Sequence, residues 1–275
     1  MNSSFGSLES LRNRAIPDQA AVYVLKQGYR THPLDNRSRE SREGLVDIRD
    51  LGILGENHYS IARNPPYYHR IEGSISSLLV REGVGNRLRK IQDRLHMVGL
   101  SLWVFDAWRP NEVQKYFHDI WMPKKIVAEF GDIDQDLLKQ KVEKYWASSS
   151  TSKLSPAPHI TGSAIDLTIC WKDTKQLLWM GSLFDDVSEV SHLDHFEKLK
   201  NDRICYSDEE ALHNRRLLYW LMSDAEFSAN PSEWWHYSYG DQMWARLGNH
   251  RAAIYPAADI GMVNVRSTAL NRKAA

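Results

Sequence analysis

The sequence predicts an α+β fold, in which helices and strands alternate irregularly along the chain. Some segments repeat hydrophobic residues with a helical period, whereas other short segments are continuously apolar and rich in branched and aromatic residues, as buried strands are. No glycine-rich nucleotide loop is found, which argues against a doubly wound parallel sheet. At 275 residues, the chain is long enough for one large domain.

Three parts of the chain are distinguished by their patterning. Residues 1–44 are polar and weakly patterned, so we expect an N-terminal extension with order only around 20–27. Residues 45–250 carry the periodic segments and are predicted to form the folded domain. Residues 251–275 show no recognisable pattern and are predicted to form a C-terminal tail.

The first clear helix is predicted at 75–98. Its apolar residues repeat at a 4,3,4,3 spacing that places them on one face, namely Val84, Leu88, Ile91, Leu95 and Val98. Gly99 follows, where a C-terminal cap is expected. A buried strand is predicted next, at 100–105, and Pro110 lies shortly after its end.

Further helices and strands are predicted downstream. Two helices and two strands are expected at 111–129, 134–147, 164–171 and 234–239. The run Ser207-Asp-Glu-Glu210 fits a capping box, so Ser207 is predicted to be the N-cap of a helix that ends near 225.

Composition excludes several classes of partner. Lysine plus arginine equals aspartate plus glutamate, so no net positive charge favours nucleic acid or an anionic membrane. No run of about eighteen apolar residues is present, so no membrane span is expected. Cys170 and Cys205 are too few and too far apart to indicate a disulfide framework. The N-terminus does not read as a secretory signal, so we expect a cytoplasmic protein, with the periplasm as the alternative.

Two short segments concentrate the chemically active side chains, His159-Ile-Thr-Gly-Ser-Ala-Ile-Asp166 and Glu233-Trp-Trp-His236. Two imidazoles and one carboxylate form a three-ligand set for a zinc ion whose fourth position stays open to water. Glu233, three residues from a ligand, is placed to take a proton from that water. Asp166 lies in an apolar run, where an unpaired carboxylate would be costly. The pattern therefore predicts a metallohydrolase with one zinc ion per chain.

These segments resemble the zinc-dependent D-alanyl-D-alanine dipeptidases known from vancomycin resistance, which are related to D,D-carboxypeptidases and the hedgehog zinc domain. The resemblance runs from roughly 45 to 240, and its matching segments are Asp106-Ala-Trp-Arg-Pro110, Gly162 to Thr168, Met180-Gly-Ser-x-Phe-Asp185, Asn214-Arg-Arg216 and Glu233 to Tyr237. It implies a central, mainly antiparallel sheet flanked by helices. It also implies hydrolysis of a small D,D-dipeptide such as D-Ala-D-Ala by metal-activated water, in cell-wall metabolism.

The resemblance also implies roles for individual residues. Arg109 would stabilise the oxyanion of the tetrahedral intermediate, with Asp106 orienting its guanidinium. Asp185 would hold the free amino group of the substrate, although an exposed turn carboxylate is the alternative. Tyr59, at the family's spacing before Asn64, would lie near the pocket.

Several alternatives follow from the residues themselves. Ala157 and Pro158 stand where the dipeptidases typically have serines that help to hold the substrate carboxylate, and Thr161 replaces a basic residue. A zinc-dependent hydrolase of a related peptide or another amide is therefore the first alternative, and a non-catalytic zinc-binding module the second. For His192 and His195, a second metal site is one interpretation and a polar surface loop is the alternative.

Overall fold

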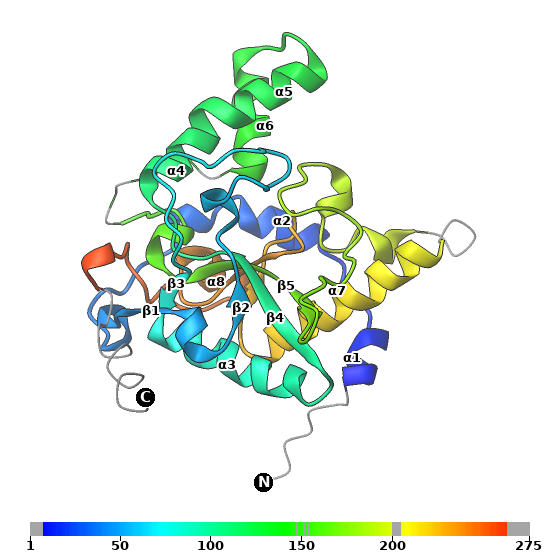
Figure 1. Ribbon diagram of the computed structural model, residues 1–275. Helices are drawn as coiled ribbons and strands as arrows, with labels where there is room; N and C mark the ends of the chain where they lie inside the picture. The colour runs from blue at the N-terminus through cyan, green and yellow to red at the C-terminus, as the bar shows by residue number, and fades with distance from the viewer. Residues whose placement is uncertain (1–7, 147, 151, 153, 200–204, 263–275) are drawn as a thin grey trace.

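The computed structural model describes residues 8–262 except 147, 151, 153 and 200–204, and a five-stranded sheet lies at its centre (Figure 1). In spatial order, the strands are β2 (Leu54–Gly55), β4 (Leu100–Asp106), β5 (Ala164–Trp171), β7 (His236–Ser238) and β6 (Ser228–Ala229). β2 and β4 run parallel, and the other neighbours are antiparallel. The predicted α+β class with a mainly antiparallel sheet is confirmed.

A second, two-stranded antiparallel sheet pairs β1 (Leu45–Asp47) with β3 (Leu79–Arg81). The buried side chain of Arg81 donates to the carbonyl oxygens of Thr161, Glu43 and Pro256, at 2.8, 2.5 and 2.9 Å. A buried guanidinium requires such acceptors. Arg81 therefore ties this sheet to the segment that leads into β5.

Helix α3 (Glu82–His96) lies against the central sheet, as Figure 1 shows. The predicted start at 75 is wrong, because residues 79–81 extend as β3 and pair with β1. The predicted apolar face is buried as far as Leu95, but Val98 lies beyond the end of the helix and is 51% exposed. Gly99 has φ +74°, the left-handed conformation expected of a residue that follows a helix.

Helix α7 (Tyr206–Asp224) begins earlier than the sequence predicts. Its N-cap is Cys205 rather than Ser207, because the Asp208 side chain at the third helical position accepts from the Cys205 backbone N–H. Its buried residues include Ala211, Leu217 and Leu221.

Three helices form an arm that projects from the sheet (Figure 1): α4 (Asn111–Tyr116), α5 (Met122–Phe130) and α6 (Gln135–Tyr145). A π-helical turn at Phe117–Trp121 interrupts the predicted helix 111–129. The predicted helix 134–147 is confirmed with a shorter C-terminal end. Strand β7 is shorter than the predicted strand 234–239, because the two tryptophans before it form a turn.

The N-terminal segment packs against the rest of the chain. Helix α1 (Leu8–Asn13) contacts α7, and α2 (Ala20–Lys26) contacts α8 (Gln242–Leu247). The expectation that only residues 20–27 are ordered is therefore wrong. The domain boundary at residue 44 stays a prediction, and most of the predicted tail, 263–275, lies outside the described residues.

Short 3-10 turns connect these elements, at Tyr29–Thr31, Glu40–Arg42, Ile48–Leu51, His58–Ser60, His159–Thr161, Glu189–Ser191, Phe196–Lys198 and Ile260–Met262. Cys170 is buried and Cys205 is exposed, and both are free thiols. In the described part of the chain, no helix is both long and apolar enough to cross a membrane.

Candidate active site

The register of the central sheet brings three polar residues into one row. Asp106 at the end of β4 lies opposite Asp166 on β5, and Asp166 lies opposite His236 on β7. Directly opposed residues of neighbouring strands project their side chains on the same face of a sheet. Residues far apart in sequence are thus placed side by side by backbone pairing alone.

His159 reaches this row from the 3-10 turn that precedes β5. Its Nδ1 lies 2.8 Å from the carbonyl oxygen of Ala107, which directs Nε2 toward the row. Gly162 then turns the chain into β5 with φ +73°. A Cβ at this position would lie 2.6 Å from Leu45 Cδ2, so the turn requires glycine for both conformation and space.

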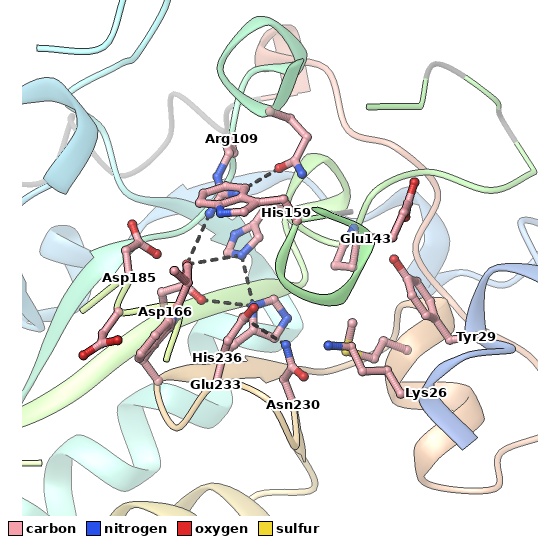
Figure 2. Close-up of a pocket in the computed structure, with 17 residues that line it drawn as sticks. Lys26, Tyr29, Arg109, Glu143, His159, Asp166, Asp185, Asn230, Glu233 and His236 are labelled. Carbon is pink, nitrogen blue, oxygen red and sulfur yellow. Dashed lines mark hydrogen bonds and ion pairs between the residues drawn. The ribbon is translucent and has the colours of Figure 1, made fainter. Parts of the chain in front are cut away.

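The predicted metal ligands converge, as Figure 2 shows. His159 Nε2 lies 3.3 Å from Asp166 Oδ2, and His236 Nδ1 lies 3.0 Å from Asp166 Oδ1. The two ring nitrogens are 3.2 Å apart. Burial on its own would raise the pKa of Asp166, but the two imidazoles outweigh it and hold the pKa well below its usual range. Asp166 is therefore an ionised carboxylate between two imidazoles.

This donor set fits a divalent metal ion. Each imidazole has its other nitrogen near a protein oxygen, Ala107 O for His159 and Ser238 Oγ for His236, at 2.8 and 3.4 Å. Such outer contacts fix the tautomer and the ring orientation of metal-binding histidines. Among the described residues, His159, Asp166 and His236 form a group of His and Asp side chains whose ligand atoms all lie within 4.8 Å of one another. His192 and His195 belong to no such group within the described residues.

Glu233 lies beside the cluster without joining it. Its Oε2 is 3.8 Å from His236 Nδ1 and accepts from Asn230 Nδ2 at 2.9 Å. The side chain is 12% exposed, and burial raises the pKa of Glu233, while the positive charge of Lys26 lowers it. Its carboxylate is thus mostly shielded from water and close to a predicted metal ligand.

Arg109 follows β4 and is held on three sides. Its Nε donates to Asp106 Oδ2 and its Nη1 to Gln114 Oε1, both at 2.8 Å. Its Nη2 lies 3.3 Å from Asp166 Oδ2 and from the Tyr59 hydroxyl. Arg109 forms a salt bridge with Asp106 and also lies beside Asp166. A fixed positive charge therefore adjoins the predicted metal ligands.

Asp185 is a buried carboxylate, not an exposed turn residue, with 5% of its surface accessible. It accepts from the hydroxyls of Tyr59 and Tyr67, at 2.9 and 2.8 Å. Burial raises the pKa of Asp185 well above its ordinary value, and the nearby charge of Asp166 raises it further. Tyr59 contacts both Asp185 and Arg109, so it lies behind two residues that line the pocket without lining it itself.

One pocket is lined by the three predicted metal ligands and by Glu233, Arg109 and Asp185 (Figure 2). Its wall also includes Trp146, Trp235 and Met243. Trp235 lines the pocket, whereas the indole Nε1 of Trp234 donates to Ser182 Oγ at 2.9 Å. Aromatic walls exclude water and strengthen charge interactions inside the site. Trp235, rather than Trp234, therefore supplies part of the apolar wall of this pocket.

The D-Ala-D-Ala dipeptidase family model matches residues 52–253. This chain belongs to that peptidase family. It is 34% identical over 189 residues to the D-alanyl-D-alanine dipeptidase of Synechocystis sp., covering 64% of this chain and 75% of the relative. It is 30% identical over 175 residues to the D-alanyl-D-alanine dipeptidase of Enterococcus faecalis, covering 61% of this chain and 76% of the relative.

Two solved structures are also similar to this member of the dipeptidase family. VanYB in complex with D-alanine-D-alanine is 14% identical with a TM-score of 0.38, covering 74% of this chain and 94% of that chain. The LD-carboxypeptidase LdcB is 15% identical with a TM-score of 0.33, covering 66% of this chain and 70% of that chain.

Sequence reasoning missed several residues of this dipeptidase-family pocket. Trp146 lines the pocket, whereas Tyr67 lies behind it and donates to the lining carboxylate of Asp185. Both lie in stretches whose patterns give no functional signal. Lys26 and Tyr29 line the pocket from the segment that was expected to be an extension, before the start of the family match. Glu143 reaches it from α6. No motif marks these residues, because they are brought to the site by packing between distant segments.

Proposed function

We propose that this chain is a zinc-dependent dipeptidase that hydrolyses a D,D-dipeptide such as D-Ala-D-Ala. One observation carries the proposal: a potential three-ligand metal site shares a pocket with Glu233 and Arg109, neither of which is part of the ligand set. A purely structural zinc site needs neither a spare carboxylate nor a fixed arginine. The names of the relatives from Synechocystis and Enterococcus support the same substrate.

His159 Nε2, an Asp166 carboxylate oxygen and His236 Nδ1 are the atoms that would hold the zinc ion. When bound, zinc supplies Lewis acidity and lowers the pKa of a water molecule toward neutrality. Two neutral imidazoles and one carboxylate are ligands that zinc accepts.

Glu233 is the proposed general base and, later in the reaction, the general acid. Its carboxylate takes a proton from the attacking water and gives it to the amine that leaves when the peptide bond breaks. A general base works best when its pKa approaches the working pH, and burial shifts the pKa of Glu233 in that direction. The hydrogen bond from Asn230 fixes the carboxylate without neutralising it.

Arg109 is proposed to stabilise the oxyanion of the tetrahedral intermediate. Asp106 and Gln114 hold two sides of the guanidinium, so the group is preorganised rather than mobile. Its bond to Asp166 places the charge directly beside the predicted ligand cluster. Preorganised charge in a water-excluded site has a large effect on the transition state.

Asp185 is proposed to bind the free amino group of the substrate. Two tyrosine hydroxyls, from Tyr59 and Tyr67, orient its carboxylate. A buried carboxylate with a raised pKa is stabilised in its charged form by an incoming ammonium group. This interaction would select substrates with an unblocked N-terminus.

The direct test measures amino acid released by the zinc-loaded protein from D,D-, L,D- and L,L-dipeptides, with Glu233→Ala as the control. We expect release from D-Ala-D-Ala by the wild type, and a loss of at least about 10²-fold in the variant, since a general base contributes about 10²- to 10⁴-fold. The variant should retain stoichiometric zinc by atomic absorption. Loss of zinc would instead make Glu233 a ligand, and silence across the panel would refute the dipeptidase.

A second candidate is a zinc-dependent hydrolase of another amide with a different C-terminal part. The buried Ala157 and the pocket-lining Pro158 provide no hydroxyl next to His159, which favours this candidate. Cleavage of larger amides, together with no cleavage of D-Ala-D-Ala, would select it.

A further inference from the structure

Lys26 lies on the other side of the ligand cluster from Asp185 (Figure 2). It is the last residue of α2, and its half-buried side chain points into the pocket. Its Nζ donates to Ser232 Oγ at 3.1 Å, next to Glu233. The family match begins at residue 52, so this charge comes from a part of the chain that the family pattern does not include.

The charges that line the pocket give Lys26 a distinct position. Five lining residues are carboxylates, namely Glu143, Asp166, Asp185, Asp186 and Glu233, and the lining arginine and lysine are Arg109 and Lys26. Arg109 already directs Nε, Nη1 and Nη2 to protein acceptors beside the cluster. Lys26 is therefore the lining cation on the side away from Asp185.

A dipeptide with free ends carries a positive charge at one end and a negative charge at the other. Burying its carboxylate without a positive partner or strong donors would be costly. Next to His159, the residues Ala157 and Pro158 present no side-chain donor. An ammonium group has three N–H donors, so a bond to Ser232 is compatible with binding a carboxylate.

We propose that Lys26 binds the C-terminal carboxylate of the substrate, so that Asp185 and Lys26 hold the two charged ends on either side of the ligand cluster. This inference rests on the proposed dipeptidase function and adds the residue that selects the free C-terminus. A substrate with a blocked or displaced carboxylate would lose the contact with Lys26. The N-terminal segment would thus determine substrate length as well as end chemistry.

The test compares D-Ala-D-Ala with its C-terminal amide, using wild type, Lys26→Met and Lys26→Arg. We expect Lys26→Met to raise KM for the free acid at least about tenfold, in line with the loss of a charged hydrogen bond. KM for the amide should change little, so the preference for the acid should collapse. Lys26→Arg should restore most of the preference. Lys90→Met, at an exposed lysine of α3, is the matched control and should behave as wild type.

A pH profile separates this role from an effect of Lys26 on Glu233. If Lys26 only adjusts the base, Lys26→Met should move the acid limb of kcat equally for acid and amide, with the preference for the acid unchanged. That outcome would overturn the proposal. Under the proposal, the ratio of kcat/KM for acid and amide falls at every pH at which both are cleaved.

A binding measurement keeps the two hypotheses apart. Zinc-loaded Glu233→Ala protein, with and without Lys26→Met, is titrated with D-Ala-D-Ala and with its amide by calorimetry. Selective binding of the acid that disappears in Lys26→Met supports the inference, even if the wild type shows no turnover and the dipeptidase function fails. Equal binding of acid and amide by the protein that retains Lys26, or acid selectivity that survives Lys26→Met, refutes the inference.

Discussion

At the scale of single residues, Arg109 offers a test of transition-state stabilisation. Lysine keeps the charge but cannot reproduce the fork that contacts Asp106 and Gln114. We expect Arg109→Lys to lower kcat by about 10²- to 10³-fold, the effect of removing one preorganised donor, with a smaller change in KM. Steady-state kinetics on D-Ala-D-Ala would measure both. Arg89→Lys, at an exposed arginine of α3, is the control, and an unaltered kcat in Arg109→Lys would contradict the assignment.

Asp185 offers a test of amino-end recognition. Asp185→Asn keeps the size of the side chain but removes the charge that would face an ammonium group. We expect KM for D-Ala-D-Ala to rise about 10- to 100-fold, since a hydrogen bond to a charged group contributes about 1.5–3 kcal/mol. The N-acetylated dipeptide, which has no ammonium group, should discriminate less between wild type and variant. Equal losses for both substrates would point to a structural role.

The cluster of His159, Asp166 and His236 could be predicted from sequence because its members lie in two short segments with distinctive spacing. His159 and Asp166 are separated by one turn and the start of one strand, so local conformation brings them together. Tyr67 and Lys26 could not be predicted in the same way. Tyr67 is buried against Asp185 from 118 positions away, and no local pattern encodes such a contact.

At the scale of elements, the loop that carries Asp185 is anchored by a buried arginine of α7. Arg215 donates to the carbonyl oxygens of Met180, His192 and Val190, each at 2.7 Å. Arg215→Met would remove the donor to these three carbonyl oxygens, one of which is in a buried hydrogen bond and two in partly buried ones. We expect it to lower the free energy of unfolding by about 3 kcal/mol, because hydrogen bonds to charged groups contribute about 1.5–3 kcal/mol each and are not additive.

Denaturant unfolding would measure this loss. Arg216→Lys is the adjacent control, since its bonds to Glu197 lie at a partly exposed site and lysine can keep the ion pair. An Arg215→Met protein as stable as Arg216→Lys would show that the loop does not depend on this anchor.

The helical arm contains an ion pair that makes stability depend on pH. His118 Nε2 lies 3.3 Å from Glu143 Oε1, and this bond raises the pKa of His118 and lowers that of Glu143. Because the pKa of His118 is higher in the folded protein, His118 contributes stability below its unfolded pKa of 6.5. This contribution is lost as pH rises through the folded pKa. Because the pKa of Glu143 is lower in the folded protein, Glu143 contributes stability above its unfolded pKa of 4.5. This contribution is lost as pH falls through the folded pKa.

The contribution of this pair is therefore greatest between these two values. We expect His118→Gln to be less stable than wild type by a few tenths to about 1 kcal/mol near pH 5.5, because the pair is partly exposed and screened. The difference should be smaller at about pH 8, because His118, whose pKa is raised on folding, loses its charge as pH rises. Thermal unfolding at both pH values would measure it, and a constant difference would exclude the ion pair as the cause.

Element types were more predictable than element ends. The buried face of α3 follows from hydrophobic period, but its start does not, because residues 79–81 satisfy their backbone groups by pairing with β1. The start of α7 depends on which side chain caps it. The Asp208 carboxylate accepts from the Cys205 N–H, so Cys205 is the N-cap and the helix begins at Tyr206. With Ser207 as the N-cap, Tyr206 and Ser207 would lie outside the helix.

At the scale of the whole molecule, the site is assembled from segments across most of the chain. The sheet aligns Asp106, Asp166 and His236, the residue after α6 of the arm is Trp146, and α2 supplies Lys26. The sequence indicates the strands that carry the row, because each is locally apolar. It does not indicate that α2 reaches the pocket, because that depends on contacts between surfaces that only the folded chain forms.

The contacts of residues 8–31 lead to a prediction about truncation. Leu11 and Ile16 are buried in the main core, and the Ile16 and Gln19 backbone N–H groups donate to Glu197 and Asp194 at 2.8 and 3.1 Å. Removing residues 1–44 would expose this core and leave the buried Asp194 with fewer partners. Each buried aliphatic side chain contributes about 1.5–3 kcal/mol, so we expect a loss of about 4 kcal/mol in the free energy of unfolding.

Denaturant unfolding of a chain that begins at residue 45, beside one that lacks only residues 1–7, would measure this loss. The shorter deletion precedes α1 and should leave the midpoint unchanged, because the described contacts remain. The longer deletion should also lose the preference for D-Ala-D-Ala over its amide, since it removes Lys26. An unchanged midpoint and preference would show that residues 1–44 are a dispensable extension, as their polar composition predicts. A lower midpoint with the preference intact would make the segment structural and assign carboxylate recognition to another residue.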